Sequence, residues 1–227
     1  MGPGDWVDMM LNRSPAIALD AGRVVLRPLR MADYPAWAEV RRQSREFLTP
    51  WEPTWPRNAL SRSAFRVRVR RNNYEIRQDL GYSLVLFRRS DQALLGGVTL
   101  SNIRRGVAQA GTLGYWIGAP YARQGYMTEA LYCLIGYAAQ QLRLHRLEAA
   151  CLPSNIPSQR LLAKCGFVEE GRADGYLRIN GVWHDHLLFG LVLDSWRLRV
   201  AARHEQALRA PDAGKLIQPA SAARHAN

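Results

Sequence analysis

The segment ARQGYM, residues 122–127, places a glycine directly before an amphipathic helix. Apolar residues recur at helical spacing over about 126–142, at Met127, Ala130, Leu131, Leu134, Ile135 and Ala138. The first N–H groups of such a helix lack intrahelical acceptors and lie at the positive end of its dipole, so they can bind an anion. Gly125 has no Cβ to hinder a ligand, and Arg123 adds a positive charge. The segment predicts a phosphate site or, alternatively, a plain corner between a strand and a helix.

Asn155 and Ser158 form a second polar pair, at the start of a helix that we predict over 156–164 and that ends at Gly166. Asparagine is a favoured N-cap residue. Residues three apart also share one helix face, so both side chains can meet one ligand. The spacing leaves a capping role and a ligand-binding role open for both residues.

The order of the remaining elements places both motifs in one α/β (α+β) domain, with a mixed, mostly antiparallel sheet flanked by helices. Segment 61–76 is ambiguous, because valines alternate with arginines as in a strand while the polar flanks allow a helix. The other predicted elements are a strand at 23–30, a helix from near Asp33 to 48, strands at 81–89, 93–103 and 110–118, the helix at 126–142, a strand at 145–152, the helix at 156–164 and a hairpin with its turn at 179–181.

The domain boundaries follow from shifts in composition along the 227 residues. Residues 1–20 are predicted to be an N-terminal extension, and 21–194 the single domain. Residues 195–227 are predicted to be a C-terminal tail, helical to about 209 and disordered beyond.

The charge and cysteine content narrow the function classes. The formal net charge is +12, which suits an anionic partner such as RNA, a ribosome surface or a phosphate-rich cofactor. Three cysteines without metal-ligand spacing fit a reduced cytoplasmic protein. No apolar run reaches the roughly 18 residues of a membrane span, and the start has no secretory pattern. We therefore expect a cytoplasmic protein without a membrane partner.

His184 and His186 would share one face of a strand, which raises the question of a metal site. Two ligands are too few to hold a metal ion. We therefore expect no metal.

Five stretches together resemble the GNAT acetyltransferases. ARQGYM is similar to their pyrophosphate loop, Q/R-x-x-G-x-G/A, and PSNIPSQRLLAKCGF (153–167) is similar to their N-x-x-[AS]-x-x-L-x-x-x-x-G-F element. FLTPWEP (47–53), GYWIG (114–118) and NGVWHDHLL (180–188) resemble blocks of the ribosomal-protein-alanine N-acetyltransferases, the Rim group. The likeness extends from about Arg23 to Leu193.

The resemblance implies an acyltransferase that moves the acetyl group of acetyl-CoA to an amine. It implies that backbone N–H groups of the loop hold the pyrophosphate, and that an N–H near Trp116 stabilises the thioester oxygen. Asn155 would hydrogen-bond the pantetheine arm and Ser158 the sulfur. The implied cofactor-binding residues are Trp116, Ile117, Gly118, Arg123, Gln124, Gly125, Tyr126, Met127, Thr128, Asn155 and Ser158.

The sequence departs from the family pattern at four positions. Ala122 and Met127 replace the first and last residues of the loop pattern. Leu162 and Ala150 stand where many GNAT enzymes carry a tyrosine acid and a glutamate base, which excludes catalysis by that pair.

Ser158, Glu52 and Asp174 are the predicted catalytic residues. Glu52 lies in the Pro/Trp-rich loop 49–56, which should line the substrate groove. Asp174 lies one residue before Gly175, where related enzymes have an acid, and a one-residue shift turns a strand side chain to the other face. A strong base is unnecessary, because an N-terminal amine with a pKa of about 7.7–8.0 is already partly neutral.

The resemblance implies a ribosomal-protein N-terminus as the acceptor. The arginine-rich segment 57–71 carries no acidic residue. It could contact ribosomal RNA or an acidic protein, or be only a solvated helix face. Two alternatives stay open. One is the same chemistry on a polyamine, an aminoglycoside or a lysine, and the other is a non-catalytic protein that binds RNA or the ribosome.

Overall fold

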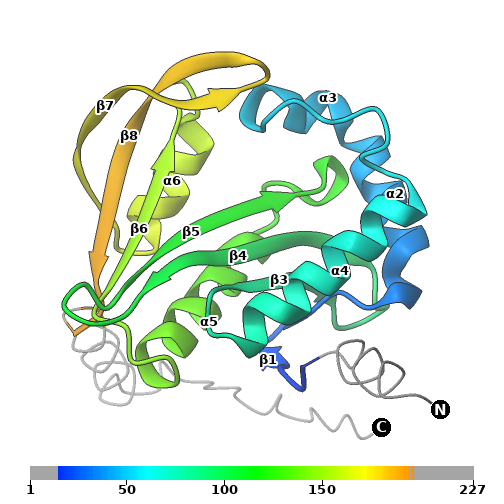
Figure 1. Cartoon of the computed structure of the whole chain (residues 1–227), viewed down its shortest axis with the longest axis horizontal. Coiled ribbons are helices and arrows are strands. Elements are labelled where there is room, and N and C mark those ends of the chain that lie inside the picture. Colours follow the sequence, from blue (N-terminus) through cyan, green and yellow to red (C-terminus); the bar gives the residue numbers. More distant parts are fainter. Residues whose placement is uncertain (1–14, 195, 197–227) are drawn as a thin grey trace, which may run out of the picture.

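The computed structural model describes residues 15–194 and 196, and their eight strands form one sheet (Figure 1). The order across the sheet is β1-β2-β3-β4-β5-β6-β8-β7. Only β5 and β6 are parallel neighbours, and all the other pairs are antiparallel, as predicted. The strands are β1 (Leu19–Asp20), β2 (Val24–Arg27), β3 (Tyr82–Arg88), β4 (Leu94–Arg104), β5 (Ala110–Ile117), β6 (Arg146–Cys151), β7 (Val168–Ile179) and β8 (Val182–Val192).

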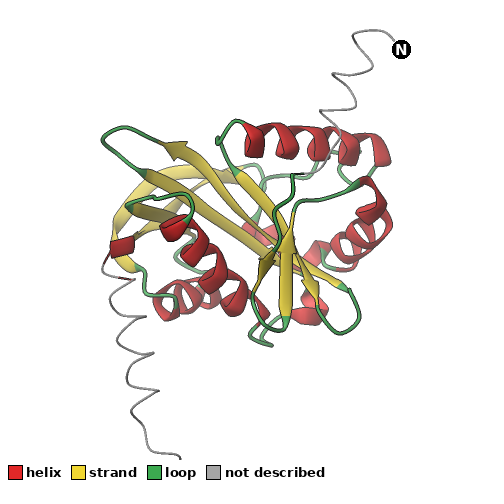
Figure 2. Ribbon diagram, turned by 90° about the horizontal axis from the view of Figure 1, so that it is seen from below, coloured by secondary structure: helices red, strands yellow, loops and turns green. Residues whose placement is uncertain are grey.

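Helices cover both faces of this sheet (Figure 2). The structure resolves the ambiguity at 61–76 in favour of a helix, α4, which begins where the Ser61 side chain accepts a hydrogen bond from Ala64 N at 3.2 Å. The helices are η1 (Met31–Asp33), α2 (Tyr34–Gln43), α3 (Arg45–Leu48), η2 (Thr49–Trp51), α4 (Arg62–Arg77), η3 (Ala119–Tyr121), α5 (Tyr126–Gln140) and α6 (Ile156–Lys164).

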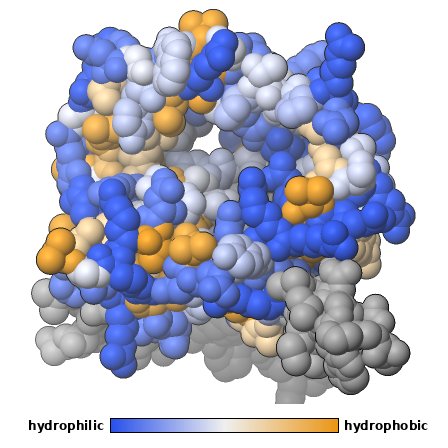
Figure 3. Space-filling model, in the orientation of Figure 1, coloured by the Kyte–Doolittle hydropathy of each residue, from blue (hydrophilic) through white to orange (hydrophobic). Residues whose placement is uncertain are grey.

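β5 and β6 separate to form a wedge, which is the feature that positions the site. They pair over only three positions, from Ala110↔Arg146 to Thr112↔Glu148. Beyond this point β5 stays paired with β4, and β6 stays paired with β8 as far as Cys151↔Leu187. The strands therefore fan apart (Figure 1), and the surface is hollowed above β5 (Figure 3).

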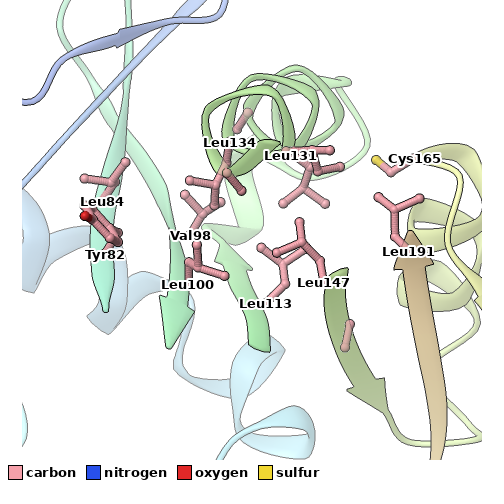
Figure 4. Packing of buried hydrophobic residues seen from close by; sticks show 14 of the residues in the cluster. Tyr82, Leu84, Val98, Leu100, Leu113, Leu131, Leu134, Leu147, Cys165 and Leu191 are labelled. Carbon is pink, nitrogen blue, oxygen red and sulfur yellow. The ribbon is translucent and has the colours of Figure 1, made fainter. Parts of the chain in front are cut away.

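The hydrophobic core fixes which face of the sheet each helix covers. Leu131 and Leu134 of α5 lie over Val98, Leu113 and Leu147 of the central strands (Figure 4). On the opposite face, a smaller cluster joins α2 and α4 to β3 and β4 through residues such as Trp37, Phe65 and Val85. Burying these apolar side chains on both faces holds the two walls of the wedge in place.

The predicted domain boundaries are only partly within the described residues. β1 pairs with β2, so the sheet begins two residues before the expected boundary at 21. The helix and the disordered tail predicted beyond 194 fall almost entirely outside the described residues. None of the helices described is long and apolar enough to cross a membrane.

Candidate active site

The loop before α5 has the backbone geometry of an anion site. Arg123 and Gly125 both adopt left-handed conformations, with φ of 62° and 84°, and Gly125 is the N-cap of α5. No side chain caps this helix, so its first N–H groups are left for a ligand. Successive N–H groups in such a turn form a concavity that favours negative charge.

The side chains of several loop residues make contacts within the protein, whereas their backbone N–H groups can bind a ligand. Tyr126 and Met127 are 8% exposed and anchor the start of α5 in the core. Gln124 Nε2 donates to Pro120 O at 2.9 Å and ties the loop to η3. Arg123 is exposed, and Thr128 lies in the first turn of α5. These residues can therefore serve a ligand mainly through their N–H groups.

Arg23, which the sequence marked only as the start of a strand, holds the loop from the side of β2. Its Nη2 donates to Gln124 O at 3.0 Å, and its Nε donates to Glu129 Oε1 at 2.7 Å. Its guanidinium also lies 4.7 Å from the centre of the Tyr126 ring. A Cβ on Gly125 would come within 3.0 Å of Arg23 Nη2. The glycine therefore permits both the left-handed turn and the approach of this arginine.

Asn155 and Ser158 lie at the other side of the wedge, at the start of α6. Asn155 Oδ1 accepts a hydrogen bond from Ser158 N at 3.2 Å, which confirms the predicted N-cap. Ser158 Oγ lies 2.6 Å from the hydroxyl oxygen of Tyr115 on β5. This contact joins the two diverging walls, and sequence reasoning missed Tyr115.

Cys151 stands at the end of β6. Burial raises the pKa of its thiol, and the neighbouring Ser158 side chain opposes that rise. Leu162, at the family's tyrosine position, is fully buried in the core. Ser158, Tyr115 and Cys151 therefore lie close together at this end of the wedge.

The expected oxyanion donor is one of three backbone N–H groups at the end of β5, those of Trp116, Ile117 and Gly118. One of these three already has a hydrogen-bond acceptor within the protein. Gly118 N donates to Leu95 O at 2.7 Å, which corrects the expectation that this N–H is available. Trp116 and Ile117 lie opposite Gly97 and Gly96 of β4. A Cβ at Gly97 would lie 2.6 Å from Trp116 Nε1, so glycine is needed for the indole to pack there.

Glu52 is engaged in a nearly buried ion pair. Arg41 donates to Glu52 Oε1 at 2.8 Å and to Oε2 at 2.7 Å, and Trp55 Nε1 donates to Oε2 at 2.7 Å. The Arg41 guanidinium lies over the rings of Trp55 and Trp116, at 4.2 and 4.7 Å from their centres. Since both oxygens of Glu52 are occupied, the geometry argues against its expected role as base and gives it a structural one.

Asp174 is equally poorly placed for the expected role. Its side chain is 87% exposed, and Arg172 Nε lies 3.3 Å from its Oδ1. The strand is irregular here, because the β7–β8 register shifts between Ala173 and Leu177 and Gly175 adopts a φ of 53°. Asp185 accepts a hydrogen bond from Gly175 N at 2.8 Å, and Asp174 therefore points into solvent instead of toward the wedge.

The tip of the β7–β8 hairpin reaches the Pro/Trp-rich loop. Asn180 and Gly181 form its two-residue turn, both with positive φ. Asn180 N donates to Glu52 O at 3.0 Å. A Cβ on Gly181 would lie 3.6 Å from Thr54 Oγ1. These contacts bridge the two sides of the wedge at its open end, near α3 (Figure 1).

The helix α4 presents arginines to solvent. Arg62, Arg66 and Arg70 recur every four residues and are exposed. Val67 and Tyr74 on the same helix are 66% and 51% exposed. Among the described residues no carboxylate pairs with these three arginines, whereas Arg71 lies 3.5 Å from Glu75. The surface over α4 is accordingly hydrophilic (Figure 3).

Comparisons with known proteins agree with this arrangement. A family model described as "Acetyltransferase (GNAT) domain" matches residues 23–168. The [ribosomal protein uS5]-alanine N-acetyltransferase of Escherichia coli (strain K12) is 34% identical over 182 residues, covering 80% of this chain and 94% of that protein. The solved ribosomal-protein-S5-alanine acetyltransferase from Vibrio fischeri has a TM-score of 0.74 at 30% identity, covering 79% of this chain and 98% of that one. Mycobacterium smegmatis RimJ in complex with CoA-disulfide has a TM-score of 0.73 at 31% identity, covering 82% and 94%.

Proposed function

Because the chain belongs to the GNAT acetyltransferase family, it is an acyltransferase that uses acetyl-CoA, and we propose that its acceptor is the N-terminal alanine amine of a ribosomal protein. The E. coli and V. fischeri relatives, named for this reaction on one ribosomal protein, are similar over nearly their whole length.

The observation that carries the choice of acceptor is the bridge across the open end of the wedge. The hydrogen bond from Asn180 N to Glu52 O joins the hairpin to the loop, and Arg41 holds that loop through its pair with Glu52. An opening bounded on both sides admits the end of an extended chain. The ε-amine of a lysine in the middle of a folded surface would have to enter while the chain on both sides of that lysine stays outside the bridge. The α-amine of a peptide therefore fits best.

The binding of acetyl-CoA uses the two sides of the wedge. The N–H groups from Arg123 to Thr128 and the dipole of α5 hold the pyrophosphate. Asn155 and Ser158, at the start of α6, lie where the pantetheine arm would end. The backbone N–H of Trp116 or Ile117 stabilises the thioester oxygen as negative charge develops on it.

The proton balance needs no dedicated carboxylate. The acceptor amine, with a pKa of about 7.7–8.0, supplies its own neutral fraction near physiological pH. Its nitrogen attacks the acetyl carbon, the C–S bond breaks, and the amine proton leaves to water. This assignment agrees with the occupied oxygens of Glu52 and the solvent-facing side chain of Asp174.

The test is release of the coenzyme A thiol in three parallel reactions. The acceptors are a ribosomal-protein peptide that starts with alanine, a lysine peptide with a blocked N-terminus, and spermidine. We expect turnover with the first alone. Turnover of the lysine peptide or spermidine in its place would overturn the acceptor. No turnover, with no thermal shift on adding coenzyme A, would favour a non-catalytic binding protein.

We propose in addition that the α4 arginines, Arg62, Arg66 and Arg70, contact ribosomal RNA when the protein acts on an assembled or assembling ribosome. These three exposed guanidiniums, which pair with no carboxylate in the part of the chain that the structure describes, suit the phosphate backbone. Changing Arg66 and Arg70 to Gln should weaken cosedimentation with ribosomes and flatten its salt dependence, while turnover of the free peptide stays unchanged. Arg104 and Arg105, which pair with Glu148 and Asp79, provide matched control positions. If variants at Arg104 and Arg105 lost as much ribosome binding as variants at Arg66 and Arg70, a specific contact through α4 would be contradicted.

A further inference from the structure

We infer that Tyr115 is a positioning residue for the reaction, because its hydroxyl donates to Ser158 Oγ and thereby turns the Ser158 hydrogen toward the leaving sulfur. This inference rests on the proposed function, in which Ser158 meets the sulfur of coenzyme A. It concerns a residue of β5 that lies in the GYWIG stretch but is not among the site residues predicted from the sequence.

The two hydroxyl oxygens in the Tyr115–Ser158 contact lie 2.6 Å apart, and by geometry either could donate. The Ser158 carbonyl oxygen lies 3.5 Å from the Tyr115 hydroxyl oxygen, which is too far to compete for the Tyr115 hydrogen. A phenol is a stronger donor than an aliphatic alcohol. Tyr115 therefore donates and Ser158 accepts, which leaves the Ser158 hydrogen for another group.

Burial keeps Tyr115 in the donor state. The side chain lies between the sheet and α6, and desolvation raises its pKa above the ordinary value for tyrosine. The direction of this pKa shift matters, because a phenolate could not donate a hydrogen bond to Ser158. Because its pKa is raised, the hydroxyl stays protonated around the pKa of the acceptor amine, about 7.7–8.0.

Ser158 already acts on one sulfur atom of this protein, because its side chain lowers the pKa of the Cys151 thiol against the effect of burial. The sulfur of coenzyme A, arriving from the α5 side of the wedge, would take the Ser158 hydrogen. When the C–S bond breaks, its electron pair stays on sulfur, and Ser158 stabilises that thiolate. Neither Ser158 nor Tyr115 loses its proton, because a thiol with a pKa of about 8.5 leaves as the thiolate.

The test is a double-mutant cycle with Tyr115→Phe, Ser158→Ala and both changes together. Tyr115→Phe should lower kcat about three- to tenfold, the effect of one neutral hydrogen bond, with little change in the KM for acetyl-CoA. In the Ser158→Ala background the same change should have almost no further effect. Tyr132→Phe is the matched control, because Tyr132 donates to Lys164 O at 2.7 Å away from the wedge, and its kcat should not change.

A second readout needs no acceptor. The thiol of bound coenzyme A is titrated by its thiolate absorbance, with a desulfo analogue as the blank. Its pKa should be higher in Tyr115→Phe than in the unchanged protein, and higher again in Ser158→Ala. An unchanged thiol pKa in Tyr115→Phe, or additive kcat losses in the cycle, would overturn the inference. If another amine proves to be the acceptor, only the acceptor proposal fails, and the cycle is measured with that amine.

Discussion

Replacing Gly125 by alanine tests the anion site through two separable effects. Gly125 has a φ of 84°, so any other residue there is strained by about 1–2 kcal/mol. For a domain of this size that strain corresponds to a fall in Tm of about 2–8 °C. The added Cβ would also come within 3.0 Å of Arg23 Nη2 and displace the guanidinium that holds Gln124 O.

The second effect falls on acetyl-CoA. Once Arg23 is displaced, the loop no longer keeps all its N–H groups aimed at the pyrophosphate. Losing one hydrogen bond to a charged group weakens binding by about 1.5–3 kcal/mol, or about ten- to hundredfold in affinity. We therefore expect Gly125→Ala to raise the KM for acetyl-CoA by at least tenfold, measured by initial rates at saturating peptide.

Gly106→Ala separates the two effects. Gly106 also has a positive φ, 62°, and a Cβ there would meet nothing within 4 Å. The strain and the fall in Tm should therefore be similar, whereas the KM for acetyl-CoA should not change. If both variants lose stability and neither changes KM, the loop does not bind the pyrophosphate and this reasoning is refuted.

Further predictions concern the neighbours of the site. Arg23→Gln should raise the KM for acetyl-CoA severalfold with little change in kcat, and an unchanged KM would show that the loop holds its shape alone. Glu52→Gln should lower the Tm, because the ion pair between Arg41 and Glu52 stabilises the fold by about 1–3 kcal/mol. The same change should reduce kcat far less than the hundredfold or more expected on removing a general base. Asp174→Asn should leave kcat within twofold in the same peptide assay, and a large loss would restore it as a base. Burial raises the pKa of Cys165 to about 12, so at pH 8 this thiol stays protonated and a thiol reagent should label it only after unfolding, as peptide mapping would reveal.

The parts of the site that depend on local sequence could be predicted. The N-cap at Asn155, the turn at 179–181 and the amphipathic helix after Gly125 each need only neighbouring residues. Segment 61–76 was ambiguous because its arginines alternate with valines. Three buried residues of this segment, Phe65, Val69 and Ile76, lie at helical spacing, and Ser61 is the N-cap of the helix that contains them.

The contacts that cross the wedge could not be predicted, because they depend on how distant elements pack. Tyr115 and Ser158 are 43 residues apart and meet only because β5 and β6 pair over three positions before they diverge. Arg23 reaches Gln124 across 101 residues for a similar reason. The partner of Glu52 could not be predicted either, because its loop position suggested a free carboxylate, whereas α2 places Arg41 against both of its oxygens.

The most direct test of the central claim places the two competing amines in one molecule. A ribosomal-protein peptide that starts with alanine and contains an internal lysine is incubated with acetyl-CoA and the protein, and mass spectrometry locates the acetyl group. The account predicts acetylation of the α-amine alone, because only a chain end fits the bridged opening of the wedge. Acetylation of the lysine side chain, with the α-amine left free, would contradict it.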